Sequence, residues 1–339
     1  MGFFVSIVYN ENNKFRDMNV IFDGNYLFHR NFSVFSTYYK GESIEDVLQD
    51  KEKQQVLLRK CVIDFCHTVR MFKDVKKVIF TIDSSSWRYN IYANYKYSLT
   101  KVRDDSYRYF LICLDLFQKL LVDRGIIVSR VNGAEGDDLL YIWSLVLGYL
   151  GDENNVIITG DSDIRQLVSD RVSVMNSNAK RLMLYCLEER KEWLSKQLNE
   201  DVPISCLEPF DVVLYKVIMG DKSDNIPKLF RRFGDKAFQK FLDWLKPYKE
   251  PKNVDLVTMA RWIADKICEF AKKREDEVLG QILFNLKLTW LNLSVYDKSD
   301  YQTYNSEELL ENMIDEVNSK KYSYKKEYTL EAFYGMLIK

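Results

Sequence analysis

The sequence predicts an α/β protein with a central, mostly parallel sheet flanked by helices, followed by a mostly helical region. In the first half of the chain, short β-branched runs alternate with long segments of helical periodicity. The runs are apolar on both faces, as expected for strands that helices cover on both sides. After about residue 208 the strand signals cease, and Gly-Asp and Pro interruptions separate short helical segments.

Four strands are expected in the first half of the chain. They are "NVIF" (19–22), "KVIFTI" (77–82), "IIVSRV" (126–131) and "NVIITG" (155–160). The clearest helical segments between them are residues 51–72 and 104–124. We therefore predict a first domain over residues 1–206, a small helical module over residues 207–248, and a helical C-terminal region over residues 249–339 that begins near Pro251.

Length and composition allow a full hydrophobic core. The 339 residues are 47% hydrophobic and 29% charged, which is unlike a disordered chain. The 49 basic and 50 acidic residues give a formal net charge of −1, which neither favours nor excludes a nucleic-acid partner. The longest apolar run, residues 139–150, is too short for a membrane span, and no secretory signal is read. With six irregularly spaced cysteines, these features predict a monomeric cytoplasmic protein without a membrane partner.

Carboxylates follow every predicted strand. Asp23 follows the first strand and Asp83 the second, while "NGAEGDDLL" (132–140) comes after the third. Ligands of parallel α/β sheets bind outside the carboxyl ends of the strands, so these side chains should meet at one edge. Two further acids come from "GDKSDN" in the helical module. The nine acids expected there are Asp23, Asp83, Glu135, Asp137, Asp138, Asp161, Asp163, Asp221 and Asp224.

Two explanations compete for these acids. Acids in the first turn of a helix gain roughly 0.3–1 kcal/mol each from the helix dipole, which accounts for Asp137 and Asp138 taken alone. Two carboxylates about 4 Å apart, however, repel by roughly 4 kcal/mol at an effective dielectric constant of about 20. Divalent cations can offset that repulsion, and oxygen-only ligands favour Mg²⁺, or Mn²⁺ in its place, over zinc. Two such ions per active site, about 3.5–4 Å apart, form the arrangement that cleaves phosphodiesters.

Five segments together resemble the 5′-nuclease superfamily, which includes flap endonucleases and 5′–3′ exonucleases. They are "FDGNYLFHR", "DSSSWR" with the downstream "YKYSLTKVR", "NGAEGDDL", "TGDSDIRQL" and "GDKSDNIP", and they span about residues 19–245. The closest resemblance is to the phage branch known as ribonuclease H-type 5′ nucleases. It implies a PIN-like fold in which residues 1–206 form a metal-dependent nuclease core. A helical arch, or clamp, is then expected over the site at about residues 84–110.

The resemblance also implies roles for the acids. The first ion would be held mainly by Asp23, Asp83, Glu135 and Asp137. The second would be held by Asp161, Asp163 and Asp221, with Asp138 and Asp224 in support. A carboxylate between two ions can serve both, so this partition stays open.

Basic residues with interleaved tyrosines are expected to hold the nucleic acid near the site. Lys96 and Arg103 match the family's phosphate-steering residues, and Arg30 is expected to assist them. Arg88, Lys101 and Arg108 add positive charge among six tyrosines between residues 89 and 109, and such a combination tracks phosphates and stacks bases. The alternative is a solvated helical face whose tyrosines pack on the core.

Residues 207–248 resemble the family's helix–three-turn–helix, in which helix N-termini and a monovalent cation grip duplex phosphates. The segment "KLFRRFG" departs from the family's glycine-rich hairpin, which puts the monovalent-cation site in doubt. Direct phosphate contacts are expected instead from Lys228, Arg231, Arg232 and Lys236. The alternative is an ordinary helical hairpin with a charged surface.

The expected function is that of a divalent-metal-dependent 5′ nuclease acting on RNA–DNA hybrids, DNA 5′ ends and 5′ flaps. Its expected task is removal of RNA primers during lagging-strand replication in a prokaryotic or phage-infected cell. "YTLEAFYGMLIK" is a candidate contact for a sliding clamp or single-strand-binding protein, or else a final helix packed on the core. The rival functions are a PIN-like ribonuclease and a catalytically silent protein that binds DNA junctions.

Overall fold

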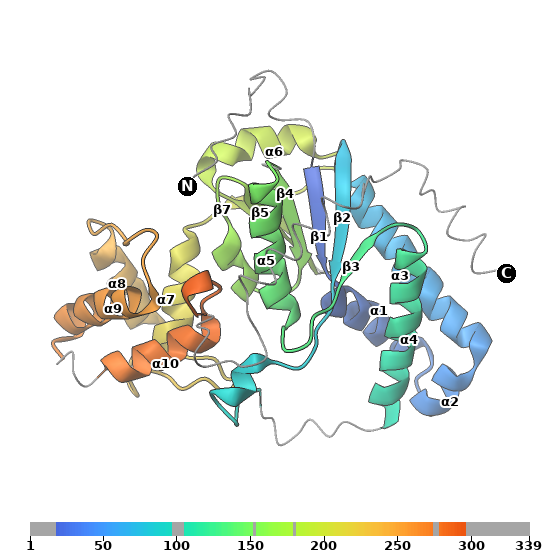
Figure 1. The fold of residues 1–339 in the computed structure, drawn as a ribbon, viewed down its shortest axis with the longest axis horizontal. Coiled ribbons are helices and arrows are strands. Elements are labelled where there is room, and N and C mark those ends of the chain that lie inside the picture. The colour runs from blue at the N-terminus through green and yellow to red at the C-terminus, as the bar shows by residue number, and fades with distance from the viewer. Residues whose placement is uncertain (1–17, 97–104, 152–153, 179–180, 274–277, 296–339) are drawn as a thin grey trace, which may run out of the picture.

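The computed structural model describes residues 18–96, 105–151, 154–178, 181–273 and 278–295. A seven-stranded sheet lies at its centre, in the order β3-β2-β1-β4-β5-β6-β7 (Figure 1). The strands are β1 (Met18–Asp23), β2 (Val75–Thr81), β3 (Ile127–Ser129), β4 (Asn155–Thr159), β5 (Val172–Asn178), β6 (Arg181–Cys186) and β7 (Ile204–Cys206). All neighbouring strands are parallel except β5 and β6, so the predicted α/β class with a mostly parallel sheet is confirmed.

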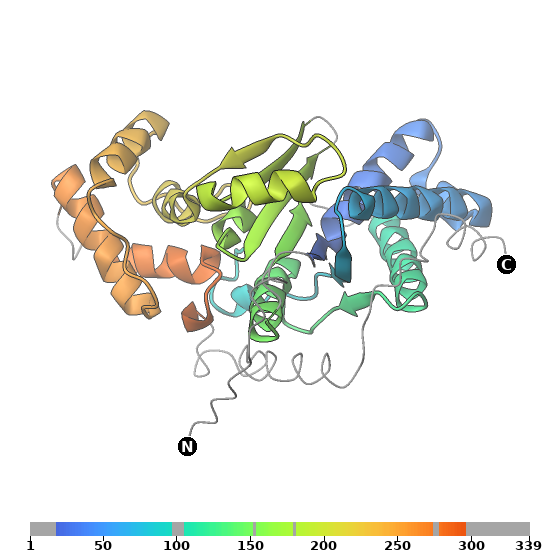
Figure 2. The ribbon, with the colours of Figure 1, turned by 90° about the horizontal axis from the view of Figure 1, so that it is seen from above.

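Helices cover both faces of this sheet (Figures 1 and 2). The helices are α1 (Gly24–Tyr38), α2 (Ile44–Gln49), α3 (Lys51–Arg70), α4 (Asp105–Val122), α5 (Gly136–Tyr149), α6 (Lys191–Gln197), α7 (Pro209–Met219), α8 (Asp235–Leu245), α9 (Leu256–Ala271) and α10 (Leu279–Thr289). Among these described helices, none has the length and apolar character required to cross a bilayer.

The alternation of side chains along β1 divides the core into two parts. Val20 and Phe22 pack with apolar residues of α1, α3 and α4 on one face of the sheet. Ile21 points to the other face and belongs to a cluster that includes α5 and extends through α7 to α10. Because a strand presents alternate residues to opposite faces, a fully apolar strand is buried on both. The C-terminal helices are therefore continuous with the core beneath α5.

The turn from β1 into α1 requires a glycine. A Cβ atom on Gly24 would collide with the Phe80 ring and with the carbonyl oxygen of Thr81 on the neighbouring strand. Asp23 precedes this glycine and caps α1 by accepting a hydrogen bond from the Tyr26 amide. The tight turn thus fixes an acidic side chain at the carboxyl end of the central strand.

The second half of the sheet was not predicted from the sequence. Strands β5 and β6 form an antiparallel hairpin, and β7 adds a short parallel edge. The predicted arch also differs in its first part, because Trp87, Arg88 and Tyr95 are buried instead of projecting over the site. A short 3₁₀ helix, Trp87–Asn90, folds this part against the body of the protein. Residues 97–104 of the predicted arch lie outside the described residues.

Candidate active site

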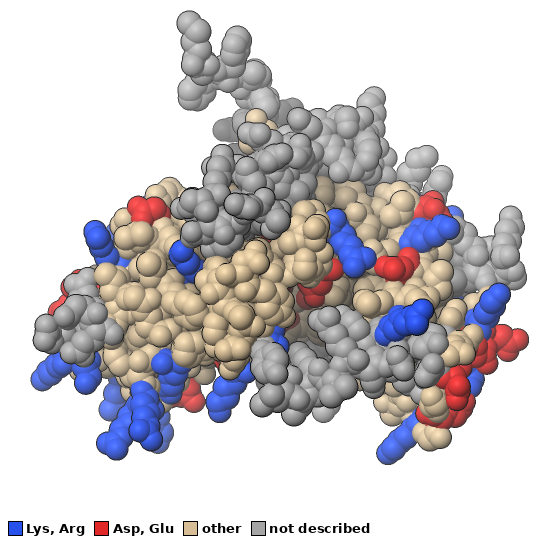
Figure 3. All heavy atoms as spheres, turned by 60° about the horizontal axis from the view of Figure 1, so that its bottom comes forward, with Lys and Arg blue, Asp and Glu red and all other residues tan. Residues whose placement is uncertain are grey.

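Acidic side chains gather where the parallel strands end. Asp23 is the last residue of β1, and Asp83 follows β2 after one intervening residue. Helix α5 begins at Gly136, within the third acidic segment, and Asp161 follows β4. Figure 3 shows acidic side chains near the middle of one face, with Lys and Arg side chains along its lower edge. The strand-end rule therefore places these acids as expected.

Asp83 is joined to the start of α5 through the backbone. Its Oδ1 atom accepts a hydrogen bond from the amide of Gly136 at 2.6 Å, and its Oδ2 atom accepts one from Asn25 at 2.8 Å. A Cβ atom on residue 136 would lie 2.8 Å from the same Asp83 oxygen, so glycine permits this approach. Loss of hydration raises the pKa of Asp83, and the carboxylates of Glu135 and Asp138 add to the rise.

Asp161 acts electrostatically on three of the other acids. It raises the pKa of Asp23, Asp137 and Asp163, in each case after the larger effect of burial. The pKa of Asp23 reaches about 7, although Thr159 donates a 2.7 Å hydrogen bond to its carboxylate. The pKa of Asp163 reaches about 6. Acids from the ends of β1 and β4 and the start of α5 therefore share one electrostatic site.

A compact group of three acids lies beside α7. One carboxylate oxygen from each of Asp163, Asp221 and Asp224 lies within 4.8 Å of the others. These are hard oxygen donors, partly exposed, and the described residues place no histidine or thiolate with them. Such a donor set fits Mg²⁺ or Mn²⁺ better than zinc. Asp224 has a raised pKa because of burial, and Asp221 is among the carboxylates that raise it further.

Lys216 is a site residue that the sequence analysis missed. Its ammonium lies 2.7 Å from Asp163 Oδ1 and also forms an ion pair with Asp221. Burial opposes the charge of Asp221, but its hydrogen bond with Lys216 holds the pKa of that carboxyl below its usual value. The apolar sequence around Lys216 in α7 gave no sign that its ammonium neutralises two acids.

Arg88 is buried, and it joins the start of α5 to the C-terminal helices. Its guanidinium donates to Glu135 at 2.7 Å and forms two bonds with Asp138, at 2.8 and 3.0 Å. Its Nε atom donates to the carbonyl of Leu288 in α10 at 3.0 Å. Only 2% of Arg88 is exposed, so the expected contact with nucleic acid is wrong for this residue.

Asp138 is likewise turned into the protein. It is fully buried, and besides Arg88 it accepts hydrogen bonds from the Trp87 indole at 3.1 Å and from the Glu135 amide at 2.9 Å. These bonds hold Asp138 as a structural support for Glu135. Burial opposes the charge of Glu135, but Arg88 and Lys96 hold the pKa of that carboxyl below its ordinary value.

Comparisons with known proteins identify the family. A family model, the 5′–3′ exonuclease N-terminal resolvase-like domain, matches residues 18–196, more than half of the chain. The chain belongs to the 5′–3′ exonuclease family. The resemblance seen in its motifs is thereby confirmed, and the family is one of nucleases, which are hydrolases.

Two curated relatives of this exonuclease-family chain differ greatly in length. The 5′–3′ exonuclease of Mycoplasmopsis pulmonis is 23% identical over 324 residues, which cover 93% of each chain. The thermostable DNA polymerase I of Thermus aquaticus is 26% identical over 282 residues, which cover 76% of this chain but 30% of the polymerase. The chain therefore spans less than a third of that polymerase.

Solved structures share the fold at low sequence identity. The 5′-exonuclease of T5 with bound zinc is 18% identical, with a TM-score of 0.51, and the match covers 90% of this chain and 99% of that one. The bacteriophage T5 flap endonuclease, in a pseudo-enzyme–product complex with DNA and metal ions, is 17% identical, with a TM-score of 0.51 and coverages of 90% and 100%. The predicted nuclease fold is confirmed by these structures.

Two basic residues predicted to act in catalysis by this exonuclease-family protein, Lys96 and Arg30, have different partners. Lys96 has a left-handed backbone, with φ of 50°, and its ammonium donates to Glu135. Its own amide donates to the carbonyl of Asp224, so the residue bridges two acidic segments. Arg30 instead forms an ion pair with Asp64 and donates to the carbonyl of Ser177, an arrangement that gives no support to its expected catalytic role.

The remaining predicted contacts with nucleic acid lie on the surface or outside the described residues. Arg108 is exposed on α4, while Lys101 and Arg103 fall in residues 97–104. The four basic residues predicted to bind phosphates in the α7–α8 module are exposed, and they are Lys228, Arg231, Arg232 and Lys236. The loop of this module packs on the segment that carries Lys96, because Asn225 donates to the carbonyl of Asn94 at 3.1 Å.

The pKa of Asp23 leads to a prediction for the metal-free protein. Its folded pKa of about 7 exceeds the ordinary value of 3.8, so between these pH values the folded state binds more protons than the unfolded state. Its contribution to stability therefore falls as pH rises from about 4 to about 7. We expect Asp23→Asn to gain stability relative to the natural protein over this range, as measured by thermal unfolding in EDTA. A difference that stays constant with pH would contradict the raised pKa, and exposed Asp201→Asn is measured in parallel as a control.

Proposed function

We propose that this protein is a divalent-metal-dependent 5′ nuclease that hydrolyses RNA–DNA hybrids, DNA 5′ ends and 5′ flaps by a two-metal mechanism. The observation that carries the proposal is the convergence of acids from five chain segments. Three of these acids, Asp163, Asp221 and Asp224, have carboxylate oxygens within 4.8 Å of one another. Family membership supplies the reaction class. Retention of every expected acid disfavours a catalytically silent relative.

The acids divide naturally between two Mg²⁺ ions. Asp161, Asp163 and Asp221 would hold one ion, with Asp224 in support. The group formed by Asp23, Asp83, Glu135 and Asp137 would hold the other. When bound, such ions supply an activated water near neutral pH and stabilise charge on the leaving oxygen. The proposal gives Asp138 a supporting position behind Glu135, since protein donors already engage its carboxylate.

The protein's own residues position the substrate. Lys96 carries its ammonium to the edge of the acidic group, where it neutralises Glu135 and can turn toward a phosphate. The Asp161 amide donates a 3.0 Å hydrogen bond to the Thr159 hydroxyl, and this bond fixes the turn after β4. Because Thr159 also holds Asp23, one hydroxyl aligns acids from two strands. Catalysis would then rest on positioning and on charge stabilisation.

The exposed basic residues of the α7–α8 module are proposed to bind duplex phosphates without reading sequence. Each phosphate contact contributes about one unit to the slope of log affinity against log salt. We expect Arg231→Ala with Arg232→Ala to lower that slope by about two units and to weaken binding equally for unrelated sequences. Fluorescence anisotropy with a labelled duplex at several salt concentrations measures this. Arg171→Ala is the matched control, because Arg171 is exposed and directly precedes β5, outside the α7–α8 module.

The proposed task is removal of RNA primers during lagging-strand replication, with a sliding clamp or single-strand-binding protein as partner. A panel of labelled substrates tests the substrate class: a 5′-labelled RNA–DNA hybrid, a 5′ flap, and a 3′ flap of equal length. Short 5′ products from the first two, with the 3′ flap intact, would support the assignment. Equal cleavage of both flaps would contradict the 5′ assignment, and cleavage of single-stranded RNA alone would favour a PIN-like ribonuclease instead.

A further inference from the structure

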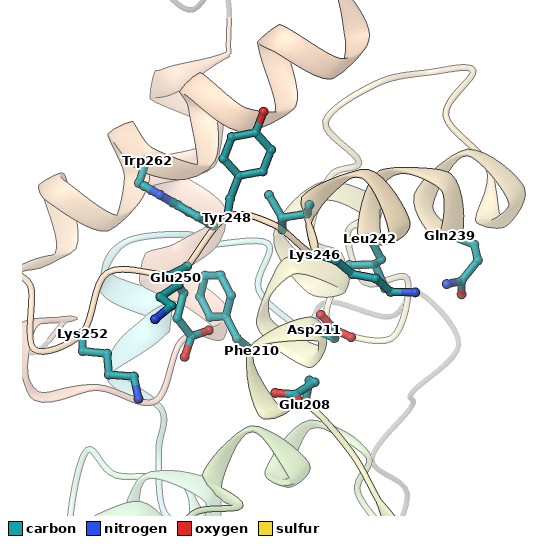
Figure 4. Close-up of a pocket in the computed structure, with 12 residues that line it drawn as sticks. Glu208, Phe210, Asp211, Gln239, Leu242, Lys246, Tyr248, Glu250, Lys252 and Trp262 are labelled. Carbon is teal, nitrogen blue, oxygen red and sulfur yellow. The ribbon is translucent and has the colours of Figure 1, made fainter.

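A pocket lies in the C-terminal helices, outside the acidic site. It has a volume of about 710 Å³ and is lined by the start of α7, the end of α8, the connection from α8 to α9, and α9 itself (Figure 4). None of its lining residues belongs to the nine acids of the candidate active site. The proposed nuclease reaction therefore gives this pocket no role.

Aromatic rings form one wall of the pocket. Phe210 and Trp262 approach with ring centroids 5.8 Å apart, and Tyr248 lies beside them. Tyr248 already attracts a cation, because the ammonium of Lys266 lies 4.6 Å from the centre of its ring. Aromatic faces attract ammonium and guanidinium groups through their quadrupoles, and they also pack against apolar stems. The wall is thus suited to a cation carried on an apolar chain.

Three carboxylates face the same space. Figure 4 shows the carboxylates of Glu208, Asp211 and Glu250 near the Phe210 ring. Within the described part of the chain, these carboxylates take part in no hydrogen bond or close ion pair. Burial raises the pKa of Asp211 and of Glu250. Glu208 adds to both increases, whereas Lys246 lowers the pKa of Asp211 and Lys252 lowers that of Glu250. A bound cation would relieve this repulsion.

The arrangement selects the chemical class of the ligand. Among the described residues only the Asp163 group brings three acidic ligands close enough for one metal ion, so these pocket acids are too widely spaced for that purpose. Lys246, Lys249 and Lys252 also line the pocket, so three ammonium groups match its three carboxylates and it offers no excess of negative charge to favour a polycation. A single positive group on an apolar stem satisfies both the rings and the acids.

We propose that this pocket binds an organic monocation, the guanidinium or ammonium group of an arginine or lysine side chain presented by a peptide. The aromatic wall would take the stem and the planar guanidinium, while Asp211 and Glu250 accept its hydrogen bonds. The lysines at the pocket would favour a peptide with acidic residues on either side of that cation. The site is independent of the nuclease reaction, and its test needs no cleavage activity.

The indole N–H signal of Trp262 in a ¹H–¹⁵N spectrum of the full chain provides a local readout. It can be assigned through Trp262→Phe, which removes one of the six tryptophan signals. The probes are a short peptide with one arginine between leucine and glutamate, the same peptide with glutamine in place of arginine, and spermidine. We expect the arginine peptide to shift the Trp262 signal saturably, and the glutamine peptide and spermidine to shift it at least tenfold less effectively.

Variants decide whether the pocket acids cause the binding. Asp211→Asn with Glu250→Gln should weaken the arginine peptide at least tenfold, while Lys252→Glu should strengthen it. Glu189→Gln, an exposed acid outside the pocket, is the control that should change nothing. The proposal is overturned if the Trp262 signal does not move, if the glutamine peptide binds equally well, or if the double variant binds as the natural protein does. Stronger binding of spermidine would also overturn it, since it would show a site for polycations.

Discussion

Replacing Arg88 with methionine is expected to lower the free energy of unfolding by about 3–5 kcal/mol, the usual cost of removing one partner from a buried ion pair. Arg88 is almost fully buried, and it pairs with both Glu135 and Asp138 while also donating to the Leu288 carbonyl. The substitution would leave two buried carboxylates short of positive charge and one carbonyl short of a donor. Denaturant unfolding measures the loss. The slope of the unfolding free energy against denaturant concentration should be the same in the variant and in the natural protein.

An exposed arginine provides the matched control for this substitution. Arg130 lies 3.5 Å from Asp115, and both side chains are about half exposed or more. Exposed pairs contribute roughly 0–1 kcal/mol, so Arg130→Met should have a small effect. Arg88→Lys keeps one charge but cannot reproduce the forked contacts, and it should recover only part of the lost stability. Equal losses for Arg88→Met and Arg130→Met would show that the buried network does not stabilise the fold.

Replacing Lys216 with methionine is expected to change the metal-free and metal-bound proteins in opposite directions. Without metal, its ammonium neutralises Asp163 and Asp221, so removing it should lower the unfolding temperature by several degrees. With Mg²⁺, the same ammonium repels the ion, so the variant should bind it more tightly. The increase in unfolding temperature on adding Mg²⁺ should therefore be larger in the variant than in the natural protein.

Lys196 is a suitable control because it pairs with Glu192 on the exposed surface of α6 and takes no part in the Asp163, Asp221 and Asp224 group. Lys196→Met should alter neither the metal-free unfolding temperature nor the effect of Mg²⁺ appreciably. A smaller Mg²⁺ effect in Lys216→Met than in the natural protein would show that the lysine supports metal binding. The site would then have to hold the ion with the ammonium in place.

The sequence allowed strands β1 to β4 of the sheet to be predicted, but not strands β5, β6 and β7. Strands β1 and β4 are buried along their whole length and contain continuous apolar runs, which are typical of strands buried on both faces. Strand β5 ends in the polar residues Asn176, Ser177 and Asn178, so its pattern resembles a loop. Its pairing with β6 is set by packing across the sheet, and local propensity does not show it.

The acids of the site were predicted because strand ends can be located in the sequence. Lys216 was missed because one of its two partners, Asp163, is 53 residues away on a different element. Arg88 was assigned to the surface because basic residues among tyrosines usually lie there. Its burial depends on Glu135 and Asp138, which are 47 and 50 residues later in the chain. Contacts of this kind have no local signal in a single sequence.

The central claim is that the gathered carboxylates hold metal ions that cleave nucleic acid, and one cleavage assay tests it most directly. A 5′-labelled RNA–DNA hybrid is incubated with Mg²⁺ or with EDTA, using the natural protein, Asp161→Asn, and exposed Asp201→Asn as the matched control. We predict short 5′ products that require Mg²⁺, persist with Asp201→Asn, and fall by about a hundredfold or more with Asp161→Asn. Cleavage that survives EDTA, or that Asp161→Asn leaves unchanged, would contradict the account.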